Sequence, residues 1–200
     1  MYLEGSYNIY IVALSVLIAI LASYSALNFA ARILHTSGKS KFFWLLSGSF
    51  VMGSGIWSMH FVGMLAFRLH APVQYDVWLT LFSMSASIIA SFIAFYITRS
   101  KKIDRIHIAI GGFFMGSGIV TMHYLGMKAM VMPATLTYNK ALWVLSAIIA
   151  FAASYAALFL FIRFRNYQAA SGLKWLASVI MGLAICGMHY TGMKAALFQG

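Results

Sequence analysis

Three short segments of the sequence repeat the same histidine and methionine positions. Each begins Met-Gly and ends Met-His-aromatic-x-Gly-Met, with an isoleucine at a fixed place between. Agreement at so many fixed offsets indicates an internal repeat rather than chance. The segments are residues 52–64, 115–127 and 181–193, and their histidines are His60, His123 and His189.

Imidazole and thioether groups in this pattern predict a metal site. Histidine is the commonest metal ligand, and methionine sulfur favours copper over magnesium, calcium or manganese. At about 100° per residue, each histidine shares a helix face with the methionine four positions later. The predicted ligands of a Cu(I)/Cu(II) site are His60, His123, His189, Met64, Met127 and Met193.

Four further residues lie near the motif histidines in sequence but are more simply explained by packing. The methionine before each histidine lies about 100° away around the helix, and a single buried cysteine commonly behaves as a small apolar residue. These weaker candidates are Met59, Met122, Met188 and Cys186. Zinc is the alternative metal, because imidazole also suits zinc, although methionine argues against it.

The composition limits the remaining chemistry. Only three residues are acidic, which argues against glycoside hydrolysis or two-metal phosphoryl transfer. One cysteine excludes a disulfide framework within the chain. Hydrophobic residues make up 62% and charged residues 8%, which predicts an integral membrane protein. We expect no nucleic-acid partner, because cations in membrane loops account for the net charge of +11.

Six apolar stretches are long enough to cross a bilayer, and they predict an all-α membrane fold. The odd spans also repeat weakly, so the unit is a helix pair present three times, in parallel orientation, with a pseudo-threefold axis along the membrane normal. We expect residues 1–200 to form a single domain, with repeats at about 8–66, 77–130 and 141–197. The predicted spans are 8–31, 42–66, 77–98, 106–130, 141–163 and 173–197.

The distribution of cations predicts the orientation. Ten of the 14 Lys and Arg residues follow the odd spans, so these loops should be cytoplasmic and both termini outside. His60 lies 19 residues beyond Lys41, and at about 1.5 Å per residue this is roughly 28 Å along the helix. The motif histidines should therefore lie near the outer face of the membrane that the chain crosses several times.

Glycines predict which way the histidines point. Gly53 and Gly63 fall on the same helix face as His60, and small residues mark close helix contacts in membranes. The histidines should therefore face the interior of the bundle. Two arrangements remain open: they converge at the pseudo-threefold axis, or each lies between neighbouring helices.

The repeated segments resemble the MHYT family of bacterial membrane sensor domains over essentially the whole chain. Only Met188-His189-Tyr190-Thr191 spells that name in full. The resemblance implies six spans, copper as ligand, and sensing of copper, redox state or a diatomic gas such as oxygen, carbon monoxide or nitric oxide. It also implies a location in the bacterial inner membrane and a cytoplasmic signalling domain or partner protein linked to cyclic-di-GMP turnover. A second copy of the chain and the lipid bilayer complete the expected partners.

Two other classes of function compete with a sensor. The histidines could relay metal ions or protons in a transporter, or hold the redox centre of a membrane copper oxidoreductase. Transporter sites usually lie at the midplane beside broken helices, which these motifs do not match. We expect no enzyme activity in this segment and favour a fragment of a larger sensor. The other histidines, which should be solvated or interfacial, are His35, His70 and His107.

Overall fold

Six long helices make up most of the computed structural model, which describes residues 5–69, 72–100, 102–165 and 172–200. Each helix is long and apolar enough to cross a membrane, which agrees with the predicted all-α membrane fold. The largest differences from the predicted spans are at the first turn: α1 ends at His35, and α2 begins at Gly38. The helices are α1 (Ile9–His35), α2 (Gly38–Ala66), α3 (Val77–Thr98), α4 (Arg105–Lys128), α5 (Lys140–Phe164) and α6 (Gly172–Ala195).

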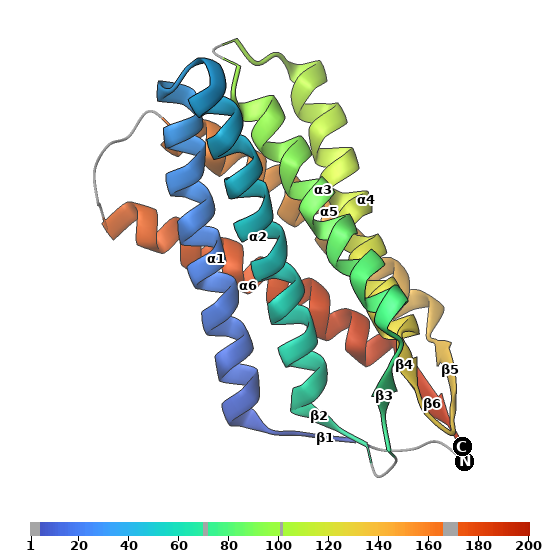
Figure 1. Cartoon of the computed structure of the whole chain (residues 1–200). Coiled ribbons are helices and arrows are strands. Elements are labelled where there is room, and N and C mark those ends of the chain that lie inside the picture. Colours follow the sequence, from blue (N-terminus) through green and yellow to red (C-terminus); the bar gives the residue numbers. More distant parts are fainter. Residues whose placement is uncertain (1–4, 70–71, 101, 166–171) are drawn as a thin grey trace.

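Three antiparallel ribbons, which the sequence analysis did not predict, lie together at one end of the bundle (Figure 1). Each ribbon joins the segment before an odd helix to the segment after the next helix, so it closes one helix pair. We call this the ribbon end. The pairs are β1 (Ser6–Tyr7) with β2 (Phe67–Arg68), β3 (Gln74–Tyr75) with β4 (Met130–Val131), and β5 (Thr135–Tyr138) with β6 (Ala196–Gln199).

The residue that begins each odd helix ties that helix to its ribbon in the same way. Its side chain accepts hydrogen bonds from backbone N–H groups of the first turn, which otherwise lack partners. Its own N–H donates to a carbonyl at the end of the following helix, at 2.8–2.9 Å. The three caps are Asn8, Asp76 and Asn139.

The three helix pairs contact one another in a closed ring. Besides the contacts within each pair, α2 packs on α3, α4 on α5, and α6 on α1. A motif glycine permits each of these contacts: a Cβ atom at Gly53 would lie 2.5 Å from the Ile88 backbone. Equivalent glycines meet the next pair at the other two contacts, so the structure has the predicted pseudo-threefold arrangement. These glycine contacts are Gly53–Ile88, Gly116–Phe151 and Gly182–Ile20.

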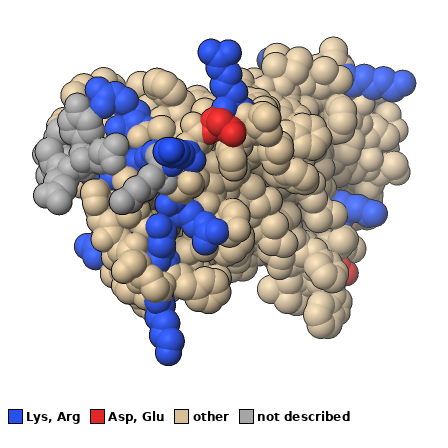
Figure 2. Space-filling model, turned by 90° about the horizontal axis from the view of Figure 1, so that it is seen from above, with Lys and Arg blue, Asp and Glu red and all other residues tan. Residues whose placement is uncertain are grey.

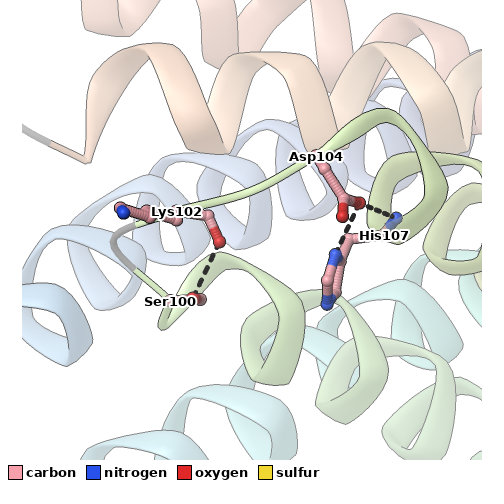
Figure 3. Close-up of polar contacts among 4 residues, drawn as sticks. All are labelled: Ser100, Lys102, Asp104 and His107. Atoms are coloured by element: carbon pink, nitrogen blue, oxygen red, sulfur yellow. Dashed lines mark hydrogen bonds and ion pairs between the residues drawn. The ribbon is translucent and has the colours of Figure 1, made fainter.

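The opposite end, where each odd helix turns into the next helix, carries most of the cations. We call it the hairpin end, and Figure 2 shows Lys and Arg side chains gathered there, with few acidic atoms. Asp104 accepts from the His107 N–H at 2.9 Å and contacts His107 Nδ1 at 2.6 Å (Figure 3). His107 and His35 are exposed. His70 lies outside the described residues. So does Lys101, one of the ten cations counted after the odd spans.

Candidate metal centre

The three motif histidines converge on the axis of the bundle. His60 Nδ1 lies 3.0 Å from His189 Nδ1 and 3.1 Å from His123 Nδ1. One nitrogen from each ring lies within 4.8 Å of the other two, and all three side chains are buried. The structure therefore chooses between the two arrangements that the sequence left open: the histidines meet at a single centre near the ribbon end.

The second nitrogen of each imidazole lies against the next helix pair. A Cβ atom at Gly126 would come within 2.2 Å of His60 Nε2, so only glycine leaves room for this ring. Each of the other two histidines contacts a motif glycine of the next helix pair in the same way, so the three contacts follow one direction around the closed ring of helix pairs. The contacts are His60 with Gly126, His123 with Gly192, and His189 with Gly63. These glycines are the ones in the Gly-Met end of each motif, so they shape the centre rather than only the helix packing.

The arrangement fits a metal ion bound by three nitrogens. A metal at about 2.0–2.1 Å from three nitrogens in a plane needs them about 3.5 Å apart. Two of the three Nδ1 pairs lie at 3.0 and 3.1 Å, and all three ligand nitrogens lie within 4.8 Å of one another. Each histidine also has a buried Nε2 atom without a hydrogen-bond partner. Buried polar atoms of this kind are costly. A metal on the three Nδ1 atoms would replace close contacts between ring nitrogens with bonds and place the proton of each ring on Nε2, which would still need an acceptor such as a buried water.

The methionines four residues after the histidines form a buried cluster of their own. Met64, Met127 and Met193 pack together with Phe198 of β6. Because they follow the histidines by about one helical turn, they cover the centre from the ribbon end. Met130 and Met132 pack against the same cluster from outside. Thioether sulfur is thus concentrated on the side of the centre that faces the ribbons.

The four weaker candidates lie elsewhere in the packing. Met59, Met122 and Cys186 belong to the main apolar core, whereas Met188 packs with Ile119 and Ala150. They do not form one group around the histidines. Their burial is explained by contacts between helices.

The aromatic residue of each motif points to the next helix pair, and in two repeats it makes a hydrogen bond there. Tyr124 Oη lies 2.6 Å from Ser146 Oγ, and Tyr190 Oη lies 2.6 Å from Ser15 Oγ. The first repeat has Phe61 at this position. The equivalent serine, Ser83, donates instead to the Met122 carbonyl at 2.7 Å. The contact between the first and second pairs therefore lacks a tyrosine link.

A pocket of about 720 Å³ opens beside the centre between α4, α5 and the β4–β5 connection. Its wall includes Tyr124 and Met127, so it reaches both the tyrosine link and the methionine cluster. Tyr138, Trp143 and Lys128 also line it. Burial, with Tyr124 nearby, raises the pKa of Tyr138 to about 12. Tyr138 therefore stays a neutral hydroxyl group near neutral pH.

A comparison with known protein families matches residues 1–39, 53–112 and 116–172 to MHYT, described as a bacterial signalling protein N-terminal repeat. These residues cover most of the chain. The chain belongs to the MHYT family. The matched segments include two of the three converging histidines, His60 and His123, whereas His189 lies beyond the last matched segment.

Curated relatives of this MHYT chain are signalling proteins. It is 46% identical to the bifunctional diguanylate cyclase/cyclic di-GMP phosphodiesterase MucR of Pseudomonas aeruginosa, over 98% of the chain and 29% of MucR. It is 36% identical to the signaling protein YkoW of Bacillus subtilis, over 100% of the chain and 25% of YkoW. The cyclic di-GMP phosphodiesterase NbdA of P. aeruginosa is 37% identical over 97% of the chain and 25% of NbdA. No solved structure matches.

The MHYT chain thus spans less than a third of the length of these relatives, and its family is described as an N-terminal repeat of bacterial signalling proteins. Sequence reasoning missed two parts of the centre's surroundings: the ribbons and the tyrosine–serine links. A signal for the links was present, because Ser15, Ser83 and Ser146 each lie eight residues before an aligned serine of the odd spans.

Proposed function

We propose that this chain senses copper, or a small ligand of bound copper, at the centre formed by His60, His123 and His189. The observation that supports it most directly is the convergence of three buried nitrogens, with distances of 3.0 and 3.1 Å between Nδ1 atoms. The methionine cluster of Met64, Met127 and Met193 supplies soft sulfur beside these nitrogens.

Charge favours Cu(I) over Zn²⁺ at this place. The donors are neutral, and no carboxylate lies among the described residues of the centre. The cost of burying an ion rises with the square of its charge, so a divalent ion would cost roughly four times as much as a monovalent one. We therefore propose Cu(I) as the resident ion, with the methionines as additional ligands when one nitrogen is displaced.

The pocket beside Tyr124 and Met127 supports a route for a small ligand. A diatomic gas such as oxygen, carbon monoxide or nitric oxide is small and apolar enough to pass a wall of methionine and aromatic side chains. Binding at the centre shifts the protein only if two packing states differ in affinity for the ligand. The three pairs of the ring are the elements that would move, because each histidine lies against the next pair.

We propose further that residues 1–200 act as one domain with the ribbon end outside the bacterial inner membrane. The gathering of cations at the hairpin end supports this orientation. The output would be cyclic-di-GMP turnover in a cytoplasmic part that this chain does not cover, as the names of two relatives suggest.

Metal content tests the proposal. We expect one copper per chain after loading with Cu(I) and washing, and none in the His60→Ala variant. His107→Ala is the matched control, because His107 is an exposed histidine outside the centre. At a free copper concentration 100 times Kd, loading should stabilise the protein by about 2.7 kcal/mol. If the wild-type protein retains zinc as well as it retains copper, the proposal of copper as the specific metal is wrong. A wild-type protein that retains neither metal would overturn the metal centre itself.

The signalling step has its own test. The matching segment of MucR is exchanged for this chain in P. aeruginosa, and cellular cyclic-di-GMP is measured with and without copper. We expect a response in the wild-type exchange and none in the His60→Ala exchange. A copper response that persists in the His60→Ala exchange would show that the output does not depend on the metal centre, and it would contradict the proposal.

A further inference from the structure

A second polar site lies at the hairpin end, away from the metal centre. A groove of about 320 Å³ runs between α1 and α2 and is lined by Tyr24, Asn28, Arg32 and Trp44 among others. Arg32 extends its guanidinium over the Trp44 ring, with 4.8 Å between the guanidinium carbon and the ring centroid. Arg32 itself is exposed, so the groove has a positive charge at its mouth.

A buried cation lies behind the same groove. The Lys174 side chain is 4% exposed, and its Nζ donates to Asn28 Oδ1 at 2.9 Å. Asn28 in turn lines the groove, so the ammonium group is separated from it by one amide. An ammonium group has three donors, and Asn28 is the acceptor found for it among the described residues. A buried cation with one neutral acceptor is costly unless an anion is close.

No carboxylate of the described residues can neutralise these two cations. The chain has three acidic residues, Glu4, Asp76 and Asp104. Asp76 caps α3 at the ribbon end, Asp104 is held by His107, and Glu4 lies outside the described residues. Lys41, another cation at this end, donates to the Arg99 carbonyl at 3.1 Å rather than to an acid.

Aromatic rings frame the groove as they do at membrane interfaces. Tyr24 stacks on Trp175 of α6 with centroids 4.3 Å apart and planes 14° from parallel. Trp44 covers the other side beneath Arg32. Tryptophan and tyrosine prefer the headgroup level of the bilayer, with one apolar face and one polar edge. The groove therefore has cations, amide and hydroxyl groups at the level where lipid phosphates lie.

We propose that this groove binds the phosphate of an anionic phospholipid, with Arg32 at its mouth as the contacting cation and Lys174, behind the Asn28 amide, as a second positive charge that attracts it. Basic pockets between membrane helices are suited to anionic headgroups. The acyl chains would lie along the exposed apolar surfaces of α1 and α2. Because the site joins α1, α2 and α6, the lipid ties the first helix pair to the last at the hairpin end.

Quenching of tryptophan fluorescence by brominated phosphatidylglycerol tests the site, because Trp44 and Trp175 lie beside it. The purified chain is reconstituted in mixtures of brominated phosphatidylglycerol and phosphatidylcholine. We expect a preference for phosphatidylglycerol that falls about fivefold in Arg32→Gln and is retained in Arg32→Lys. Lys39→Gln is the control, because Lys39 is an exposed cation of the same end outside the groove.

Lys174→Gln should reduce the preference by a similar factor. If this buried change prevents folding, Arg32→Gln decides alone, because Arg32 is exposed. Equal quenching by both lipids, or equal losses in Arg32→Gln and Lys39→Gln, would overturn the proposal. Displacement of phosphatidylglycerol by millimolar inorganic phosphate would identify a site for free phosphate instead of lipid and would also overturn it.

Discussion

His123 Nε2 lies so close to Gly192 that a Cβ atom there would come within 2.2 Å of it. The His123 side chain has little room to move away from Gly192, because Nδ1 on the opposite side of its imidazole lies 3.1 Å from His60 Nδ1. The glycine of the third motif and the histidine of the second are therefore parts of the same centre, although they are 69 residues apart.

Replacement of that glycine should damage the centre. Gly192→Ala should lower the free energy of unfolding by about 1–3 kcal/mol through overpacking. It should also weaken copper binding by about 10–100-fold, the usual range for changes that misorient a ligand. Copper titration and denaturant unfolding measure the two effects. Gly187→Ala is the control on the same helix, because a Cβ atom there meets nothing within 4 Å, and it should leave copper binding unchanged.

The tyrosine–serine links predict opposite effects in different repeats. Removing a hydroxyl with Tyr190→Phe should lower the free energy of unfolding by about 1 kcal/mol, because Ser15, which donates to the Val12 carbonyl, loses the hydroxyl from which it accepts. Phe61→Tyr should add a similar stabilisation, since Ser83 donates to Met122 and its oxygen can still accept. Unfolding in mixed micelles measures both. Loss of stability in Phe61→Tyr would show that the first repeat does not have room for the link.

Helix caps at the two ends should differ in importance. Asn139 accepts from two N–H groups of the first turn of α5, so Asn139→Ala should cost about 1 kcal/mol of stability. Ser37 begins α2 without a hydrogen bond from its side chain, so Ser37→Ala should change stability little. Unfolding curves of the two variants measured side by side decide this. A larger loss in Ser37→Ala would contradict the capping scheme.

Tyr138 should make stability depend on pH under alkaline conditions. Its pKa is raised to about 12 by burial, with Tyr124 nearby, against an ordinary value of about 10 when unfolded. The stabilising contribution is therefore complete below about pH 10 and is lost as the pH rises through about 12. Tyrosinate absorbance should lose a late-titrating component in Tyr138→Phe. The exposed Tyr10→Phe is the control, and the same loss there would contradict the assignment.

The sequence predicted the helices and the candidate ligands because both depend on local periodicity. Apolar length defined the spans, and the fixed offset between His60 and Gly63 placed them on one face. Convergence could not be predicted in this way, because His60 meets Gly126 only when the ring of helix pairs closes. The roles proposed for Met64, Met127 and Met193 as ligands remain predictions.

The ribbons escaped prediction for a different reason. Ser6–Tyr7 and Phe67–Arg68 are too short to show alternation of apolar and polar residues. Their pairing is imposed by the helices, which bring the two segments together at one end. The Tyr190–Ser15 link likewise joins residues 175 positions apart. Contacts of this kind follow from tertiary arrangement rather than from any local pattern.

The closed ring of helix pairs also limits how the protein can respond. No pair lies at a free edge, because α6 packs on α1 as α2 packs on α3. A displacement of His60 presses on Gly126, and the pair that carries Gly126 also carries His123, which presses on Gly192. A displacement of one imidazole is therefore transmitted to each of the other two helix pairs and then back to the first. The centre can therefore open only when all three helix pairs move together.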